Sequence, residues 1–418
     1  MAFKIKNSVI LLLILGFVLP TVSYAADLPV VGYVEPAYGV RYDEEGPIDK
    51  SNVLDEIRLM LEHRWYGRGG EVATVKVLAK HEDEDNSDIE VREASIFLPL
   101  STAYELNVGR QVLSWGPARY EFVNDRFTKD YRSFFLGRDM EYLKAPNDAL
   151  KLSRYGDWFN LDLVLMPDFD GSRLPQGRNI PGYHPGEQEL VAGDSMPGLI
   201  TPEKSLDNGE VHLRLHRMIG RWEAALYGYR GFTSTPAAYS SADTSSYHPE
   251  LTAGGFSLRG PLMGSVVWLE GSYEDIREGD AGVDSNLPVD KYILLAGLEY
   301  QTSPTVTYMM QGSMYVQDDA SERRAKFDPD NPESERETYR LQLSTNRTYL
   351  ADRLTLEARG FIGFTEEDWQ LRLQGEYEWS DSINIYAGSL HFDADYPHTR
   401  FGPVVENDLF YARLRYSF

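Results

Sequence analysis

The connections between the predicted strands alternate between short and long, and this alternation constrains the fold more than any single strand does. The short connections are turn-like and fall at 67–70, 99–102, 156–157, 219–220, 261–262, 302–304 and 380–381. Those between them are mostly long and polar and fall at 43–51, 114–147, 167–208, 232–250, 275–288, 318–335 and 394–406. A transmembrane barrel with periplasmic termini has short turns at one rim and long loops at the other. A soluble β-sandwich or propeller has no reason to show this pattern.

Segments with a period of two lie between these connections, as expected for strands whose side chains point to alternate faces. They fall at 30–42, 52–66, 71–81, 88–98, 103–113, 148–155, 158–166, 209–218, 221–231, 251–260, 263–274, 289–301, 305–317, 336–346, 353–364, 367–379, 382–393 and 407–418. We expect an all-β fold: a single transmembrane antiparallel β-barrel of about eighteen strands, with sixteen as the fallback, and periplasmic termini. Segment 88–98 is ambiguous, and we expect it to change face at a bulge.

The strand predicted at 367–379 shows the two faces clearly. Its outward row is Trp369, Leu371, Leu373, Gly375, Tyr377 and Trp379, and its inward row is Gln370, Arg372, Gln374, Glu376 and Glu378. Aromatic residues at both ends of an outward row are typical of the girdles that meet the two lipid interfaces.

The N-terminus has the features of a secretory signal. Lys4 and Lys6 precede an apolar run at 9–18, and small residues follow it up to Ala25. We expect 1–25 to be a signal peptide that is cleaved after Ala25. The apolar run is too short to predict a transmembrane helix.

Composition excludes several classes for 26–418, which we expect to form the barrel. The chain has no cysteine, so disulfides and thiolate metal sites are excluded. Its formal net charge of −24 argues against a basic patch that binds nucleic acid. The eight histidines are scattered, and the two close ones, His212 and His216, share a strand face with Arg214. That is a lumen stripe and not a catalytic group, so we expect no enzyme activity, no metal site and no cofactor.

The chain ends "DLFYARLRYSF", a strand with one apolar face and one arginine-bearing face. Phe418, Tyr416 and Phe410 lie on the face that would suit lipid, whereas Arg413 and Arg415 lie on the face that would suit a wet lumen. The segment resembles the C-terminal strand of bacterial outer-membrane barrels, which typically ends in Phe. The resemblance implies that Tyr416 and Phe418 form an assembly signal for the barrel-assembly machinery. It also implies outer-membrane lipid and lipopolysaccharide as partners.

Arg110 conflicts with the pattern of its strand. Tyr104, Leu106 and Val108 continue a lipid face, so parity would place Arg110 in lipid, at a cost of about 2–4 kcal/mol at mid-depth. We therefore expect Gly109 to permit a bulge that turns Arg110 towards the lumen. There it would pair with a carboxylate such as Asp125 or Asp130 and hold 114–147 across the pore.

The stretch that follows carries a more specific resemblance. The sequence "VGRQVLSWG", followed by "FVNDRFTKDYRSFF", is similar to a stretch of alginate-export-type outer-membrane channels. Related barrels of this group are associated with exporters of the resistance-nodulation-division type. The resemblance implies a barrel of about eighteen strands, an external loop over the pore, and lumen arginines that favour an anionic polysaccharide.

The resemblance also implies roles for individual residues of this sequence. It implies that Arg110 and Gln111 are pore-side residues at the strand end and that Trp115 is a packing anchor. Arg119, Asn124, Asp125 and Arg126 would belong to a constriction network. The alternative is that these residues only brace the barrel rim.

The remaining lumen charges follow from strand parity. The inward rows carry Arg214, Arg340, Arg372, Arg413 and Arg415, which we include among the pore residues. The same rows also carry many carboxylates, for example Glu56 and Glu357. Selectivity for a polyanion needs a field of one sign along the path, so this mixed lining argues against alginate itself.

Two long connections are candidates for gating the lumen. Segment 114–147 is rich in aromatics and arginine, and loop 167–208 is rich in Pro and Gly. Loops of this length are usually functional or disordered, and we expect both to lie outside the barrel or to fold into its pore. The acidic runs in other loops are either solvated or bridge divalent cations at the lipopolysaccharide surface.

These features predict a passive channel in the cell outer membrane. It would export or take up a polar, anionic solute or a polysaccharide. The alternative is an outer-membrane accessory of a resistance-nodulation-division-type or lipid exporter, carrying amphipathic cargo received from a periplasmic or inner-membrane partner.

Overall fold

The computed structural model describes residues 30–42, 47–48, 51–82, 86–177, 180–277, 288–318 and 335–418. The predicted signal peptide at 1–25 lies outside this part of the chain, as do most of the acidic runs. No helix within the described ranges is long and apolar enough to cross a membrane.

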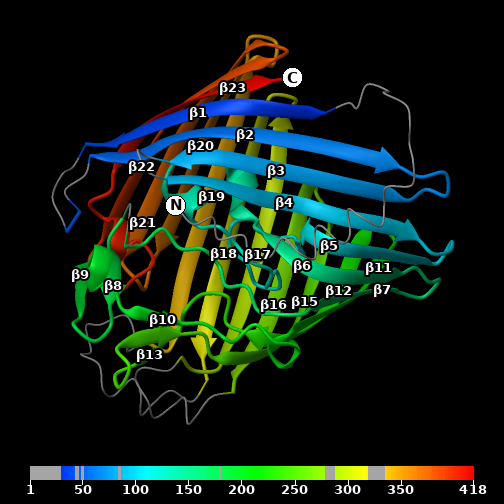
Figure 1. Cartoon of the computed structure of the whole chain (residues 1–418), viewed down its shortest axis with the longest axis horizontal. Helices are drawn as coiled ribbons and strands as arrows, with labels where there is room; N and C mark the ends of the chain where they lie inside the picture. Colours follow the sequence, from blue (N-terminus) through cyan, green and yellow to red (C-terminus); the bar gives the residue numbers. More distant parts are fainter. Residues whose placement is uncertain are drawn as a thin grey trace. The chain divides into compact units, whose positions relative to one another are not determined.

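Residues from Val31 onwards form one closed antiparallel sheet of 18 strands, which confirms the predicted fold class and strand count (Figure 1). The strands are β1 (Val31–Arg41), β2 (Asn52–Tyr66), β3 (Val72–Glu82), β4 (Asn86–Pro99), β5 (Tyr104–Val112), β6 (Pro146–Arg154), β7 (Asn160–Met166), β11 (Glu210–Ile219), β12 (Trp222–Phe232), β15 (Glu250–Leu262), β16 (Ser265–Ile276), β17 (Lys291–Ser303), β18 (Val306–Gln317), β19 (Glu337–Tyr349), β20 (Leu354–Gly363), β21 (Asp368–Ser380), β22 (Ile383–Ala394) and β23 (Leu409–Ser417). Each strand of the barrel pairs antiparallel with the barrel strands before and after it, so successive connections alternate between the two rims.

The smaller elements all lie in the long connections. They are the helix α2 (Arg132–Phe135), the 3₁₀ turns η1 (Met140–Leu143), η2 (Gly193–Ser195), η3 (Leu206–Asn208) and η5 (Gly402–Val404), and the short strands β8 (Gly182–His184), β9 (Glu189–Val191), β10 (Gly198–Ile200), β13 (Ala238–Ser240) and β14 (Ser245–Tyr247). Strands β8 and β9 form a hairpin, and β10, β14 and β13 form a small separate sheet.

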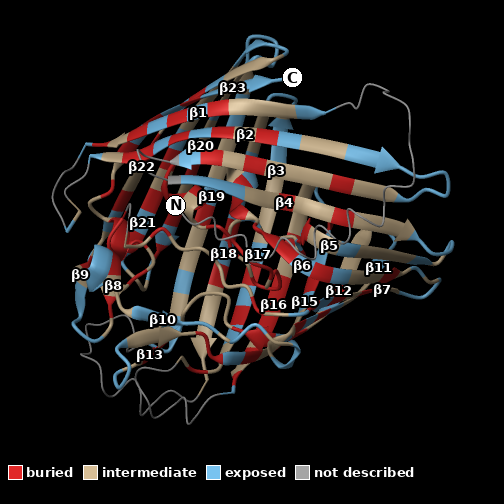
Figure 2. Ribbon diagram, in the orientation of Figure 1, coloured by how far each residue is buried: buried red, intermediate tan, exposed pale blue. Residues whose placement is uncertain are grey.

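Side chains alternate between the two faces of the barrel wall as the period of two requires. In β21, Trp369, Leu373 and Trp379 are exposed on the outer face, whereas Gln370 and Arg372 are buried on the inner face. Figure 2 shows buried and exposed positions following one another along the strands. The inner face is therefore polar and packed, and the outer face is apolar and open to lipid.

The β3–β4 pair contains the bulge that the ambiguous segment 88–98 predicted. The register of the two strands shifts between Lys76 and Val77. Arg92 stacks over the ring of Tyr142 inside the barrel, and the next residue, Glu93, lines a cavity in the lumen. Both neighbours therefore lie on the inner face, which only a bulge allows.

The barrel closes by pairing β1 with β23. Gly32 and Phe418 exchange two backbone hydrogen bonds of 3.0 Å. A Cβ at Gly32 would lie 2.2 Å from the carbonyl oxygen of Met60, so this close approach requires glycine. Tyr416 and Phe418 are each half exposed on the outer face beside this seam.

We expect Phe418→Asp to lower the amount of assembled barrel several-fold, because it replaces an outward-facing ring beside the closing seam with a charge. The matched control is Ser417→Asp, which alters the inward-facing neighbour and should assemble normally. Heat-modifiable mobility of the outer-membrane fraction measures both variants. Normal levels of the Phe418→Asp barrel would contradict this role.

Candidate functional site

The connection between β5 and β6 lies inside the barrel. We call residues 113–145 the inner segment; it leaves the wall after Val112 and rejoins it at Pro146. Its side chains contact the inner faces of strands all around the wall, as set out below. Of the two placements expected for this connection, outside the barrel or folded into the pore, the structure has the second.

We divide the inner segment into a first part, residues 113–127, and a second part, residues 128–145. Aromatic side chains anchor the first part. The rings of Trp115 and Phe127 lie 5.1 Å apart, and Phe127 stacks on His212 of β11 at 4.3 Å. Further along, the buried Val123 packs against Trp268 and Ile293 of β16 and β17. The segment therefore runs from β11 to β16 and β17, three and four strands further along the wall, and back, and it is held by apolar contacts at both ends.

Hydrogen bonds to β16 fix the same part. The Glu270 carboxylate accepts from the backbone N–H of Ala118 at 2.7 Å and from Asn124 Nδ2 at 2.8 Å. Arg126 pairs with Glu274 at 2.8 Å. Two wall carboxylates thus bind the backbone of Ala118 and the side chains of two predicted constriction residues, Asn124 and Arg126.

Glu121 joins the inner segment to three separate elements of the barrel. Its buried carboxylate pairs with Arg400 at 2.7 Å and Arg340 at 3.1 Å, and it also accepts a hydrogen bond from Tyr315. Burial alone would raise the pKa of Glu121, but the two guanidinium groups outweigh it and lower the pKa to about 2. Arg340 continues to Glu366 at 2.6 Å, so this network joins the segment to β18, β19 and the connection after β22.

The second part of the segment is held by ion pairs and by aromatic contacts with other wall strands. Buried Lys129 pairs with Asp125 at 2.9 Å, and Asp130 pairs with Arg132 at 2.5 Å. Burial raises the pKa of Asp130, but bonding to Arg132 and the nearby arginines lower it to about 2. Beyond them, Phe134 of α2 contributes to a buried aromatic cluster with Phe135, Phe361, Phe392 and Phe401. This cluster lies inside the barrel, where a water-filled pore would have polar walls.

Buried ion pairs hold the segment to β23, β1 and β2. Asp139 pairs with Arg415 at 2.7 Å and Arg413 at 3.3 Å, and Glu35 of β1 pairs with the same two arginines. Arg138 pairs with Glu56 of β2 at 2.7 Å. Burial raises the pKa of Asp139, but Arg413 and Arg415 outweigh it and lower the pKa to about 2.

The predicted pore residues therefore differ in access to solvent. Arg413, Arg372 and Asn124 are buried and brace the segment against the wall, buried Asp125 pairs with Lys129 within the segment, and buried Gln111 bonds to the neighbouring strand β6. Arg372, for example, donates to the carbonyl oxygen of Arg138 at 3.0 Å, and Gln111 donates to that of Ala149 at 3.1 Å.

The remaining predicted arginines keep some exposure. The Arg119 side chain is 50% exposed and pairs with Glu299 at 2.7 Å. Arg214 lies on the inner face of β11, between Asp162 and Glu223, and is partly exposed. Arg126, Arg340 and Arg415 are also only partly buried. These are the predicted cations that a solute in the lumen could meet.

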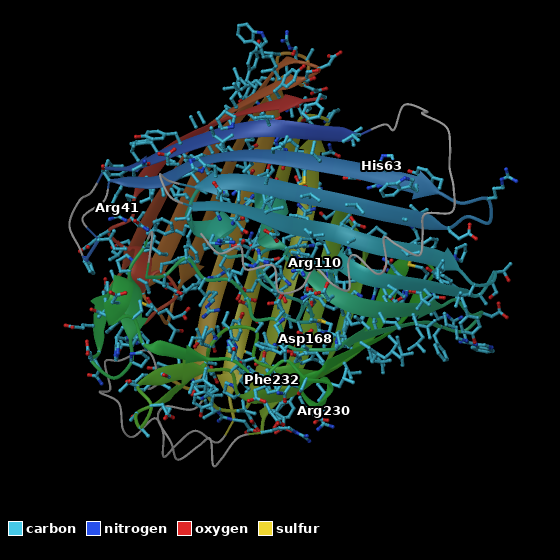
Figure 3. All side chains as sticks on the ribbon, viewed as in Figure 1. Arg41, His63, Arg110, Asp168, Arg230 and Phe232 are labelled. Atoms are coloured by element: carbon cyan, nitrogen blue, oxygen red, sulfur yellow. The ribbon has the colours of Figure 1, made fainter. Side chains whose placement is uncertain are left out.

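The expectation for Arg110, which is labelled in Figure 3, is wrong in both orientation and partner. It lies in one row with the outward-exposed Val108 and Val112, directly opposite Asp148 of β6, and pairs with that residue at 3.1 Å. The register is unbroken across Gly109 on both sides, so no bulge turns the strand. A Cβ at Gly109 would lie 2.2 Å from a carbonyl oxygen of β4, so the glycine serves a close approach of two strands. The outward charge is neutralised by a cross-strand carboxylate.

The loop at 167–208 also contacts the inner segment. The backbone N–H of Tyr131 donates to the carbonyl oxygen of Arg173 at 2.9 Å, and Arg173 pairs with Glu90 of β4 at 2.9 Å. The ring of Tyr183 lies 5.7 Å from His398, beyond β22, and β10 pairs with β14, beyond β12. The loop therefore reaches three separate parts of the rim.

Several residues of this site were not among the predicted ones. Glu121, Glu270 and Arg400 each make contacts between elements far apart in the sequence. Strand parity places Glu270 on an inner face, but nothing local indicates its partner. Within the described residues, no group of three or more His, Asp or Glu side chains is arranged to hold a metal ion.

The fold is similar to that of several known structures from Pseudomonas aeruginosa. Pseudomonas aeruginosa OccK2 (OpdF) in complex with glucuronate matches with a TM-score of 0.56 and 11% identity, over 93% of this chain and 96% of that one. P. aeruginosa OpdK with vanillate matches with a TM-score of 0.54 and 10% identity, over 93% and 97%. P. aeruginosa OccK3 (OpdO) matches with a TM-score of 0.53 and 12% identity, over 94% and 96%.

At such low identity these matches show the fold alone. No protein-family model matches the chain, and no curated protein matches its sequence. The predicted closed β-barrel of eighteen strands is confirmed, whereas export of alginate finds no support in these matches.

The outward position of Arg110 yields a test of stability. Measured along the barrel axis, Arg110 lies roughly 15 Å from Tyr104, which is within the height of about 25 Å of an apolar belt. We expect Asp148→Leu to lower the free energy of unfolding by about 1–2 kcal/mol, because it leaves the Arg110 charge unpaired on the lipid side. Arg110→Leu combined with Asp148→Leu should restore it. Urea unfolding in lipid vesicles measures both, and a double variant no better than the single one would contradict the outward pair.

A second prediction concerns Glu121. Its pKa is lowered from 4.5 to about 2, so its stabilisation is complete above pH 4.5 and is lost as the pH falls towards 2. We expect residues 118–123 to stay protected from hydrogen exchange at pH 5 and to lose protection near pH 2. Glu121→Gln should remove that protection at pH 7, because Arg400 then loses its paired carboxylate while it still lies near Arg340.

The matched control is Glu223→Gln, which removes a carboxylate that pairs with Arg214 on the wall and does not contact the inner segment. Hydrogen exchange read by mass spectrometry, corrected for the intrinsic pH dependence of exchange, compares the three proteins. Equal protection in Glu121→Gln and the original chain would show that the segment does not depend on Glu121.

Proposed function

We propose that the protein is an outer-membrane channel that passes small polar solutes through a lumen narrowed by the inner segment. One observation carries this proposal. The inner segment contacts the wall from β11 through β20 in its first part and from β20 through β4 in its second part. A barrel with this cross-section would otherwise leave a wide aqueous channel.

The strength of the contacts favours small solutes over polymers. Breaking one buried ion pair by removing a partner costs about 3–5 kcal/mol, and several such pairs hold the segment. Spontaneous withdrawal of the whole segment to admit a polysaccharide would break them together. We therefore propose solutes that fit beside the segment and do not displace it.

The charges that remain accessible have both signs. Arg119 and Arg214 keep some exposure, but each lies beside a carboxylate. Two of the structural neighbours are complexes with glucuronate and with vanillate, and both ligands are carboxylates. Small carboxylates are therefore the first class of solute to test.

The exporter accessory remains a second candidate because of one feature. The aromatic cluster around Phe134 and Phe401 is buried inside the barrel, where it fills part of the lumen with apolar side chains. A lumen closed in this way would suit a protein that conducts no ions. The two candidates therefore differ in a single measurable property.

Planar-bilayer recording of the purified full-length barrel distinguishes them. We expect discrete unitary currents that are small for a barrel of this size, because the inner segment narrows the path. The reversal potential in a salt gradient, and the partial block of current by glucuronate, would then report on solute class. A folded barrel that carries no current would contradict the channel and favour the accessory.

The loop at 167–208 provides a further prediction. Replacing 182–203 with a short Gly-Ser linker should raise unitary conductance, since the loop links three parts of the rim over the inner segment. The contacts of Arg173 with Glu90 and Asp130 are kept in this variant, so the segment itself should stay in place. Unchanged conductance in a heat-modifiable, folded barrel would place the restriction in the inner segment alone.

A further inference from the structure

A cavity of about 240 Å³ opens in the lumen wall where β4, β5 and β6 lie side by side. Its lining includes Glu93, Phe97, Glu105, Asn107, Lys151 and Ser153. These side chains all lie on the inner faces of the three strands. Leu113, at the start of the inner segment, closes the end of the cavity away from the short turns.

The charges of this cavity are not paired with one another. Within the described part of the chain, no carboxylate oxygen lies within 4.0 Å of the Lys151 ammonium, and no cationic nitrogen lies within 4.0 Å of the Glu93 or Glu105 carboxylates. Most other lumen charges do have partners at this distance. The cavity therefore holds two carboxylates and one ammonium that a ligand could pair with.

The hydrogen-bonding groups of the cavity are mainly acceptors. Glu105 accepts one bond from Tyr155 at 2.7 Å, and Glu93 accepts one from Ser95 at 3.0 Å, so each carboxylate keeps free acceptor capacity. The buried Oδ1 of Asn107 has no hydrogen-bond partner. Lys151 is the one charged donor. A complementary ligand is rich in donors at one end and carries an anionic group at the other.

Strand register sets the spacing of these charges. Lys151 lies directly opposite Asn107, and Glu105 lies opposite Ser153, so Lys151 and Glu105 are diagonal neighbours. Diagonal neighbours across an antiparallel pair are about 7–8 Å apart, which is too far for direct pairing. A ligand that bridges them needs its two charges separated by several bonds.

We propose that this cavity, which we call the β4–β6 cavity, binds small zwitterions whose ammonium and carboxylate stand at opposite ends of a short chain. The carboxylate pairs with Lys151, and the ammonium pairs with Glu105 and the free Oδ1 of Asn107. This inference deepens the proposed function and rests on it, since it makes the cavity a solute subsite on the lumen wall. It narrows the solutes from carboxylates in general to those that also carry a distant ammonium.

The test compares three probes of similar size on the purified full-length barrel: γ-aminobutyrate, butyrate and n-butylammonium. Saturation-transfer NMR measures their binding without requiring ion flow. We expect γ-aminobutyrate to bind about ten-fold more tightly than either single-charge probe, since it alone satisfies both ends of the cavity. Equal binding of the three probes would overturn the proposal without any variant being needed.

Variants then assign the two ends of the site. Lys151→Met should abolish the advantage of γ-aminobutyrate over n-butylammonium, and Glu105→Gln should reduce its advantage over butyrate. Lys204→Met is the matched control, because it removes a lysine of the external loop that pairs with Asp168. An advantage unchanged by both cavity variants would overturn the assignment to this cavity.

Binding and conduction fail separately. If γ-aminobutyrate shows the expected preference in a barrel that carries no current, the cavity stands and the channel function falls. If the barrel conducts but binds the three probes equally, the channel stands and the zwitterion site falls.

Discussion

The structure depends on charge pairing between the inner segment and the barrel wall. Taking a charge out of water is costly unless it is paired and hydrogen-bonded. Glu121 and Arg138 are buried and Asp139 is partly buried, and each finds its counter-charge on a wall strand or on the connection after β22. Because the partners lie on strands far apart around the barrel, the segment can satisfy all of them only in one position. The pairs therefore determine where the segment lies.

The sequence predicts the wall well because the orientation of each wall residue depends on its neighbours in the same strand. Whether a residue faces lipid or lumen follows from the parity of its strand, and the inward positions of Arg214, Arg340 and Arg413 were predicted this way. Arg110 shows the limit of the approach. Parity placed it outside, as the structure does, and the expectation of a bulge came from treating its charge as unpaired. Its partner, Asp148, lies on the next strand of the sheet, and only the β5–β6 register reveals it.

The inner segment was much less predictable, because its position depends on contacts that no local pattern encodes. Its richness in arginine and aromatics indicated that it is more than a solvated loop. That Glu121 would meet Arg400, some 279 residues later in the chain, could not follow from either neighbourhood alone. The aromatic cluster that includes Phe134 and Phe401 has the same origin: residues from separate loops meet inside the barrel only after closure.

The two parts of the inner segment are held differently, and this difference bears on how the lumen could widen. In the second part, Arg413 is 1% exposed and Arg138 is 4% exposed, so their pairs are dry and strongly coupled. In the first part, Arg119 is 50% exposed, so water and salt weaken its pair with Glu299 of β17. Movement that opens a path for solute should therefore begin in the first part, near Arg119 and β17, while the second part stays attached to β23 and β2. The exposed charge of Arg119 would then be the first group that a solute meets at the narrowing.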